Sequence, residues 1–119
     1  MSFSSSQIPF NPTGNTVAIT ANNPAPTGVQ ALPTNPNYTL DVGQFRIVNS
    51  STANIVHLGW GPTAALAQTN AVAAASGTPA AGLPILPGAI EVLRFTPGIF
   101  FSAFAAGAST VFITPGQGL

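Results

Sequence analysis

The chain has 119 residues, no cysteine and four charged side chains that sum to zero. This length suits one compact domain, and the lack of cysteine excludes a disulfide framework and thiolate chemistry. Without basic clusters the chain lacks the attraction that drives binding to nucleic acid or to anionic membranes, so neither is an expected partner. An ordinary domain carries about 25% charged residues, and near-zero net charge promotes association. We therefore expect other subunits to cover much of the exterior.

Residues 1–36 hold six of the twelve prolines, mixed with asparagine, serine and threonine. Such a composition cannot support a helix and would interrupt a central strand, and only residues 16–20, TVAIT, have the pattern of a strand. We expect an extended arm that lies over a neighbouring subunit; a disordered terminus is the alternative. The expected apolar anchors of this arm are Ile8, Phe10, Val17 and Ile19.

The folded domain is expected to span residues 37–119. A short strand is predicted at 38–40, and residues 44–49, QFRIVN, alternate in the manner of a strand with one buried face. Residues 55–61, IVHLGWG, form the next strand after a short polar loop. Two strands joined in this way predict an antiparallel hairpin.

Residues 62–82 are rich in alanine and leave two alternatives open. Alanine is the best helix former, and Pro62 suits a first helical position, so a short helix within 63–75 is one alternative. Leu66 and Val72 are the only sizeable apolar side chains of that stretch, and a helix with so thin an apolar stripe is marginal. The composition therefore favours a long loop that is flexible or contacts a partner.

Three strand-like runs at 89–95, 99–105 and 109–114 are separated by turns that contain glycine or proline, and they predict a β-meander. The predicted fold is all-β: an antiparallel β-sandwich or jelly-roll-like barrel with an extended N-terminal arm. Large apolar groups occupy both faces of the first two runs, as in strands covered by their own core on one side and by another subunit on the other. Alternation places Phe100 and Phe104 on one face and Phe101 on the other, and all three are candidate partner contacts.

No constellation of catalytic, cofactor-binding or metal-ligating residues is recognisable, and we expect a protein that is not an enzyme and uses no cofactor or small-molecule substrate. Asp41 and Glu91 are the only acids, and nothing in the sequence brings them into one cleft. His57 is the only histidine, so the usual ligand set of a metal site is missing. An ion pair of Glu91 with Arg46 or Arg94 is the simpler expectation.

The region from about residue 44 to 119 resembles the small β-rich virion proteins of tailed bacteriophages, in particular head decoration or cement proteins. The resemblance is carried by the strand end at Ile47–Asn49, by the Leu-Pro-Gly turn at Leu86–Gly88 before a strand that contains glutamate, and by the closing Thr-Pro-Gly-x-Gly at Thr114–Gly118. It implies a sandwich or jelly-roll-like subunit that is oligomeric, binds the major capsid protein and clamps neighbouring capsid subunits. The expected location is the virion capsid, after synthesis in the host cytoplasm.

Two other functions fit the same composition. A carbohydrate- or receptor-binding β-module of a tail fibre or other appendage could stack sugar rings on Tyr38 and Trp60. A head-tail connector or tail component is the other alternative. The N-terminus has neither a basic region nor an apolar core segment, so we do not expect a secretory signal, and no apolar run approaches the roughly 20 residues of a membrane span.

Overall fold

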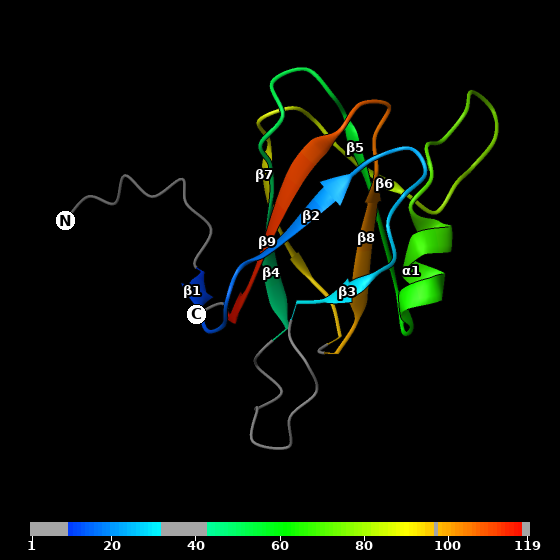
Figure 1. Cartoon of the computed structure of the whole chain (residues 1–119). Coiled ribbons are helices and arrows are strands. Elements are labelled where there is room, and N and C mark those ends of the chain that lie inside the picture. The colour runs from blue at the N-terminus through cyan, green and yellow to red at the C-terminus, as the bar shows by residue number, and fades with distance from the viewer. Residues whose placement is uncertain (1–9, 32–42, 97, 118–119) are drawn as a thin grey trace.

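A computed structural model of the chain describes residues 10–31, 43–96 and 98–117. Within these ranges the chain forms two antiparallel β-sheets that pack face to face, with one short helix on the outside (Figure 1). Sheet A consists of β1 (Asn11–Pro12), β2 (Val17–Ala21), β4 (Gln44–Asn49), β7 (Ile90–Arg94) and β9 (Ser109–Gln117). Sheet B consists of β3 (Val29–Gln30), β5 (Val56–Gly61), β6 (Leu83–Ile85) and β8 (Phe100–Phe104). The expected all-β antiparallel sandwich is confirmed.

The long strand β9 organises sheet A. It pairs with β4 on one side, and β7 continues the sheet beyond β4. Along its other side β9 pairs with β2 over residues 109–113 and with β1 at residues 116–117. Sheet B has the order β3-β8-β5-β6. Each sheet therefore presents one face to the core and one face outward.

Consecutive strands mostly change sheets, and this overturns two predicted pairings. β4 lies in sheet A and β5 in sheet B, so the predicted hairpin of residues 44–49 with 55–61 is wrong. The meander predicted over residues 89–114 is also wrong, because β7 and β9 lie in sheet A while β8 lies in sheet B. The physical reason is that alternation defines the two faces of each strand but not its partner, so a short polar loop fits a connection between the two sheets as well as a hairpin within one.

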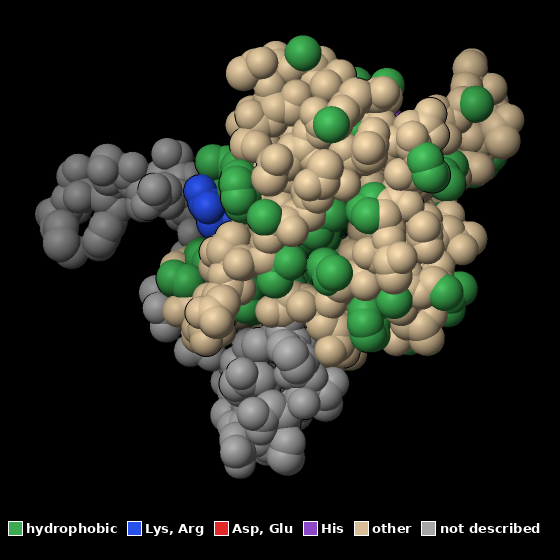
Figure 2. Space-filling model, viewed as in Figure 1, with side chains coloured by type: hydrophobic (Ala, Val, Ile, Leu, Met, Phe, Trp, Pro, Cys, Tyr) green, Lys and Arg blue, Asp and Glu red, His purple; other side chains and the backbone are tan. Residues whose placement is uncertain are grey.

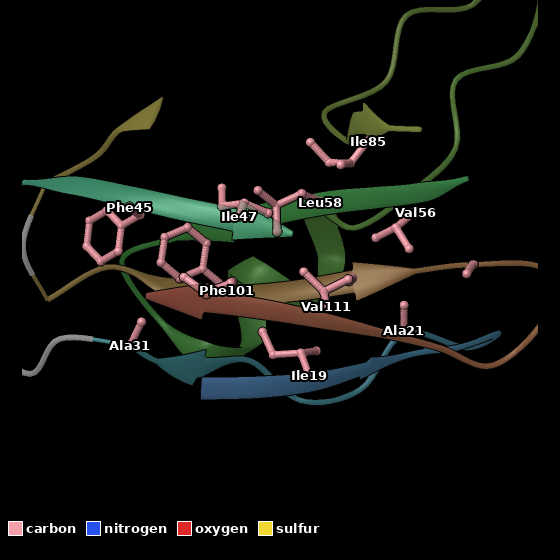
Figure 3. Close-up of a cluster of buried hydrophobic side chains, with 13 residues drawn as sticks. Ile19, Ala21, Ala31, Phe45, Ile47, Val56, Leu58, Ile85, Phe101 and Val111 are labelled. Carbon is pink, nitrogen blue, oxygen red and sulfur yellow. The ribbon is translucent and has the colours of Figure 1, made fainter. Parts of the chain in front are cut away.

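The core lies between the sheets, and Figure 3 shows its side chains pointing toward one another from both layers. An aromatic cluster fills one end of it. The ring of Phe101 packs edge-on against Phe45, at a centroid distance of 5.2 Å, and against Phe95, at 5.1 Å. Trp60 lies 5.1 Å from the same Phe95 ring. Such tilted contacts stabilise aromatic pairs beyond the area that they bury.

Residues 10–31 are part of the sandwich and not an arm separate from it. All five residues of β2 pair with β9, and Ile19 and Ala21 belong to the core. The chain then passes to sheet B, where Asn22 bridges Phe104 of β8 and β3 pairs with the same strand. The domain boundary expected after residue 36 therefore does not hold for this part of the chain, because the alternation of TVAIT directs Ile19 inward. Residues 1–9 and 32–36 lie outside the described residues.

Residues 62–82 contain both of the structures that the sequence left open. Helix α1 spans Ala64–Asn70, and the Thr63 hydroxyl caps it by accepting a 3.1 Å hydrogen bond from the backbone N–H of Leu66. Residues 72–81 follow as an exposed loop. Helix α1 lies on the outer face of sheet B (Figure 1). Within the described ranges, no helix is long and apolar enough to cross a membrane.

Candidate interaction surface

The outer face of sheet B is covered by the chain itself. Gly59 and Gly61 of β5 point outward beneath α1, and the helix sits so close that a side chain would not fit. A Cβ atom at Gly59 would lie 2.3 Å from the backbone nitrogen of Ala71, and one at Gly61 would lie 2.9 Å from the Cβ of Leu66. Ala67 on the facing side of the helix is fully buried. Glycine and alanine thus let the helix pack tightly although its apolar stripe is thin.

Among the described residues, no helix covers the outer face of sheet A, because α1, the only described helix, packs on β5 and β8 of sheet B. Phe112 of β9 is 38% exposed there, and Ile90 of β7 is 54% exposed. Figure 2 shows a surface that is mainly tan and green, in which the blue of arginine appears on the side of β7 and β9 with green side chains next to it. Within the part of the chain that the structure describes, sheet A therefore presents the uncovered side of the sandwich, which we call the bare face.

An apolar row crosses this face from edge to edge. The register places Ala18 opposite Phe112, Phe112 opposite Val48, and Val48 opposite Ile90. We call these four residues the apolar row. Residues 16–20 (TVAIT), which overlap β2, and residues 110–114 (TVFIT) of β9 have nearly the same sequence. They run antiparallel to each other, so that threonines flank the central alanine and phenylalanine. Directly opposed side chains of this kind form one continuous surface.

Both arginines of the chain lie on the same outer face as the apolar row. Arg46 pairs with Val92, and Arg94 pairs with Gln44, so both side chains share the face on which Val48 lies. Glu91 pairs with the buried Ile47 and therefore belongs to the opposite face. Strand alternation thus places Glu91 on the other face of sheet A from both arginines, so neither expected ion pair joins side chains that face each other across the strands. The described part of this face carries two cations and no carboxylate.

Two of the side chains predicted as partner contacts are buried in the protein's own core. Ile19 is 4% exposed and Phe101 is 0% exposed, so neither offers surface to a partner in the folded chain. The prediction was wrong for these two residues because a strand with large apolar side chains on both faces still buries the side chains of one face in its own core, and Ile19 and Phe101 lie on that face. Ile8 lies outside the described residues.

The remaining predicted contacts are partly buried. Phe100 and Phe104 lie on the outer face of sheet B, opposite to Phe101, as the alternation predicts. Val17 packs against the core, and Phe10 precedes β1. The predicted contacts therefore do not form one surface. Alternation with Val111 and Ile113 is a usable signal that Phe112 lies on the other face of its strand. The apolar row was missed because the pairing of β9 with β2 and β4, which assembles it, cannot be read from the local pattern.

His57 lies on the outer face of β5, between Pro84 of β6 and Phe104 of β8. Its Nδ1 atom is buried and has no hydrogen-bond partner in the described part of the chain. Desolvation by burial lowers the pKa of His57.

The described residues contain no group of histidine, cysteine, aspartate or glutamate that could hold a metal ion. Asp41, the other acid of the chain besides Glu91, lies outside the described residues.

Two shallow depressions lie on the described part of the surface. One, of about 480 Å³, is lined mainly by hydroxyl and amide side chains of the loop 50–54 and by residues 108–110. The other, of about 310 Å³, is lined by Pro62, Thr96, Gly98 and Ile99. Neither includes Trp60, whose ring packs in the aromatic cluster against the core. Trp60 is therefore unsuited to stack a sugar ring, and Tyr38 lies outside the described residues.

The described residues form an antiparallel β-sandwich in which α1 covers the outer face of sheet B and no described element covers the outer face of sheet A. Comparison of the chain with protein-family models, with curated proteins and with solved structures finds no match in any of the three. The resemblance to phage decoration proteins accordingly stays a prediction.

Proposed function

We propose that the protein is a virion structural protein, a capsid decoration or cement subunit that binds the major capsid protein lattice and stabilises it together with other copies of itself. The observation that supports this best is the bare outer face of sheet A. The protein has only four charged residues and exposes an apolar row on this face. An exposed apolar surface of this kind is typical of a site where a partner protein binds. Attachment of this kind requires no catalytic residues.

Two kinds of contact would hold such a subunit in place. The apolar row supplies burial: Phe112 is 38% and Ile90 54% exposed, so a partner that covers them gains part of the roughly 1.5–3 kcal/mol that full burial of such a side chain contributes. β7 supplies a sheet edge, because within the described residues it pairs with β4 alone. Its outward main-chain groups can accept a strand from a neighbour. Many copies on one lattice convert individually modest contacts into stable attachment.

The alternative of a carbohydrate-binding module has less support. Trp60 packs against the core, and the hydroxyl-lined depression at residues 50–54 contains no aromatic side chain. A head-tail connector or tail component would use the same bare face for its contacts. The surface therefore does not distinguish between this role and a role on the capsid. Locating the protein in virions by immunogold labelling makes that distinction.

Co-sedimentation with capsid particles assembled without this protein tests the proposal. The wild-type chain is expected to bind saturably, and the Phe112→Ser, Ile90→Ser double variant at least about tenfold more weakly, since burying anchors of this size typically accounts for more than about 1.4 kcal/mol of binding. Leu66→Ser is the matched control, because Leu66 is comparably exposed but lies on α1. Absence of wild-type binding at saturating concentration would rule out a capsid role, and saturable binding on a glycan array would favour the carbohydrate module.

A further inference from the structure

We propose that the bare face of sheet A binds a partner segment in which apolar side chains alternate with carboxylates. This inference rests on the proposed function for the identity of the partner, and it adds the chemistry by which the partner is recognised. Its basis is the coincidence of the apolar row and both arginines on one face that carries no described acid.

The two arginines are close neighbours on this face. Arg46 lies opposite Val92, and Arg94 lies opposite Gln44, so the two side chains are diagonal to each other across β4 and β7. Diagonal positions on one face of an antiparallel pair are on the order of 7 Å apart. The Arg94 guanidinium lies beside Gly43, with its Nη1 atom 3.5 Å from the place of a Cβ there. The pair adjoins the apolar row through Val48, two residues along β4 from Arg46.

Docking any partner on the apolar row would take these guanidinium groups partly out of water. A buried charge is costly unless the partner supplies acceptors, so an entirely apolar partner would be disfavoured. Carboxylates are the acceptors that match the planar fork of a guanidinium. A segment that combines apolar groups with carboxylates satisfies both parts of the face at once.

Two other occupants fit less well. A second copy of this chain would bring the same two arginines and no carboxylate from its described face, so like charges would meet. A nucleic acid would need many cationic contacts to phosphates, and the whole chain has two arginines and no lysine. Charge complementarity thus selects an acidic protein segment.

Titration with a defined peptide tests this inference without reference to capsids. The probe is a blocked hexapeptide of alternating valine and glutamate, compared with its glutamine counterpart, and binding is followed by NMR of the amide-labelled chain. We expect the glutamate peptide to shift signals of β4, β7 and β9 and to bind about fivefold or more tightly than the glutamine peptide at low salt. The Arg46→Gln, Arg94→Gln variant should lose this preference, whereas Glu91→Gln, which changes a charge on the opposite face, should retain it.

Equal affinity for the two peptides, or shifts confined to other parts of the chain, would overturn the inference. A parallel measurement on the capsid particles separates it from the proposed function. If wild-type binding weakens with rising salt and the double arginine variant binds weakly at all salt concentrations, both proposals are supported. If the chain does not bind the particles but prefers the glutamate peptide, the proposed function fails and the inference stands. If it binds the particles without salt dependence and without loss in the arginine variant, the inference fails and the proposed function stands.

Discussion

The side-chain amide of Asn49 donates to the carbonyl oxygen of Ile85 over 2.9 Å, and this bond joins the end of β4 in sheet A to the end of β6 in sheet B. The same nitrogen contacts the carbonyl oxygens of Asn54, at 2.9 Å, and Leu86, at 3.2 Å, while the side-chain oxygen accepts from the backbone N–H of Ser51. Asn49 is 0% exposed. One buried amide therefore fixes two loops at the same corner of the sandwich.

Replacing Asn49 by alanine should lower the free energy of unfolding by about 2–4 kcal/mol, because carbonyl groups buried around it lose their donor and a small cavity opens. Ser50→Ala is the control. Ser50 donates to the Thr110 carbonyl oxygen but is exposed, so its loss should cost less than about 1 kcal/mol. Urea denaturation of both variants measures the difference. Similar midpoints for the two variants would show that the amide does not hold the corner together.

A second prediction concerns the packing of α1 on sheet B. A methyl group at Gly59 would collide with the backbone of Ala71 and with the carbonyl oxygen of Ala67, 2.6 Å away. Gly59→Ala should therefore displace α1 and cost several kcal/mol, on the order of other overpacked sites. Thermal unfolding followed by far-ultraviolet circular dichroism should show a lower midpoint and less helix.

Gly77 provides the comparison for this variant. It has φ +75°, and no atom lies within 4 Å of the place that a Cβ would take, so Gly77→Ala meets backbone strain of about 1 kcal/mol but no collision. The larger loss is expected at Gly59. If Gly77→Ala proved the more destabilising of the two, close packing of the helix would not be what requires glycine in β5.

The local pattern of the chain was sufficient to predict which side chains share a face of a strand, but neither which of the two faces is buried nor which strands pair; Ile19 and Phe101, expected to contact a partner, lie in the core. Alternation in residues 44–49 correctly places Phe45 and Ile47 on one face, and the boundaries of β7, β8 and β9 agree with the expected runs to within a few residues. Strand partners depend on contacts between residues far apart in sequence. Nothing in the short polar loop before residue 55 reveals that it connects two sheets.

The bare face was beyond sequence reasoning for a related reason. Whether Phe112 lies in a covered or an open layer depends on where α1 packs, and α1 covers sheet B because glycines in β5 leave it room. The sequence of residues 62–82 favoured a loop because a helix there would have few large apolar side chains. That the facing strand β5 has glycines, which let such a helix pack closely, cannot be recognised from the helix sequence. That Phe112 points away from the core, in contrast, follows from strand alternation once β9 is known to be a strand.

Truncation distinguishes a structural N-terminal segment from an arm. A chain that begins at Asn22 lacks β1 and β2, so the apolar side of β9 loses its contact with Ile19 and the sheet gains an unpaired edge. We expect it to unfold or aggregate. A chain that begins at Phe10 keeps every described strand and should fold with a nearly unchanged midpoint. Size-exclusion chromatography with thermal unfolding compares the two, and a monomeric, cooperatively folded chain from Asn22 would contradict the assignment of β2 to the core sheet.

The last prediction is the pH dependence that His57 confers. Burial lowers the pKa of His57 from its ordinary value of 6.5, and its cross-strand neighbours Pro84 and Phe104 carry no charge that could oppose this. The unfolded chain therefore binds a proton at a higher pH than the folded chain does. The contribution of neutral His57 to the free energy of unfolding is fully present above pH 6.5. It is lost as the pH falls from 6.5 through the lower pKa that His57 has in the folded chain.

Urea denaturation between about pH 7 and pH 5 should show this decline in the wild-type chain, because aspartate and glutamate titrate mainly below that range. His57→Gln removes the titrating group at the same position and should make stability nearly independent of pH there. NMR titration of the His57 ring would give the folded-state pKa directly. A value at or above 6.5, or an equal decline in the glutamine variant, would show that burial of this ring does not control the acid sensitivity of the fold.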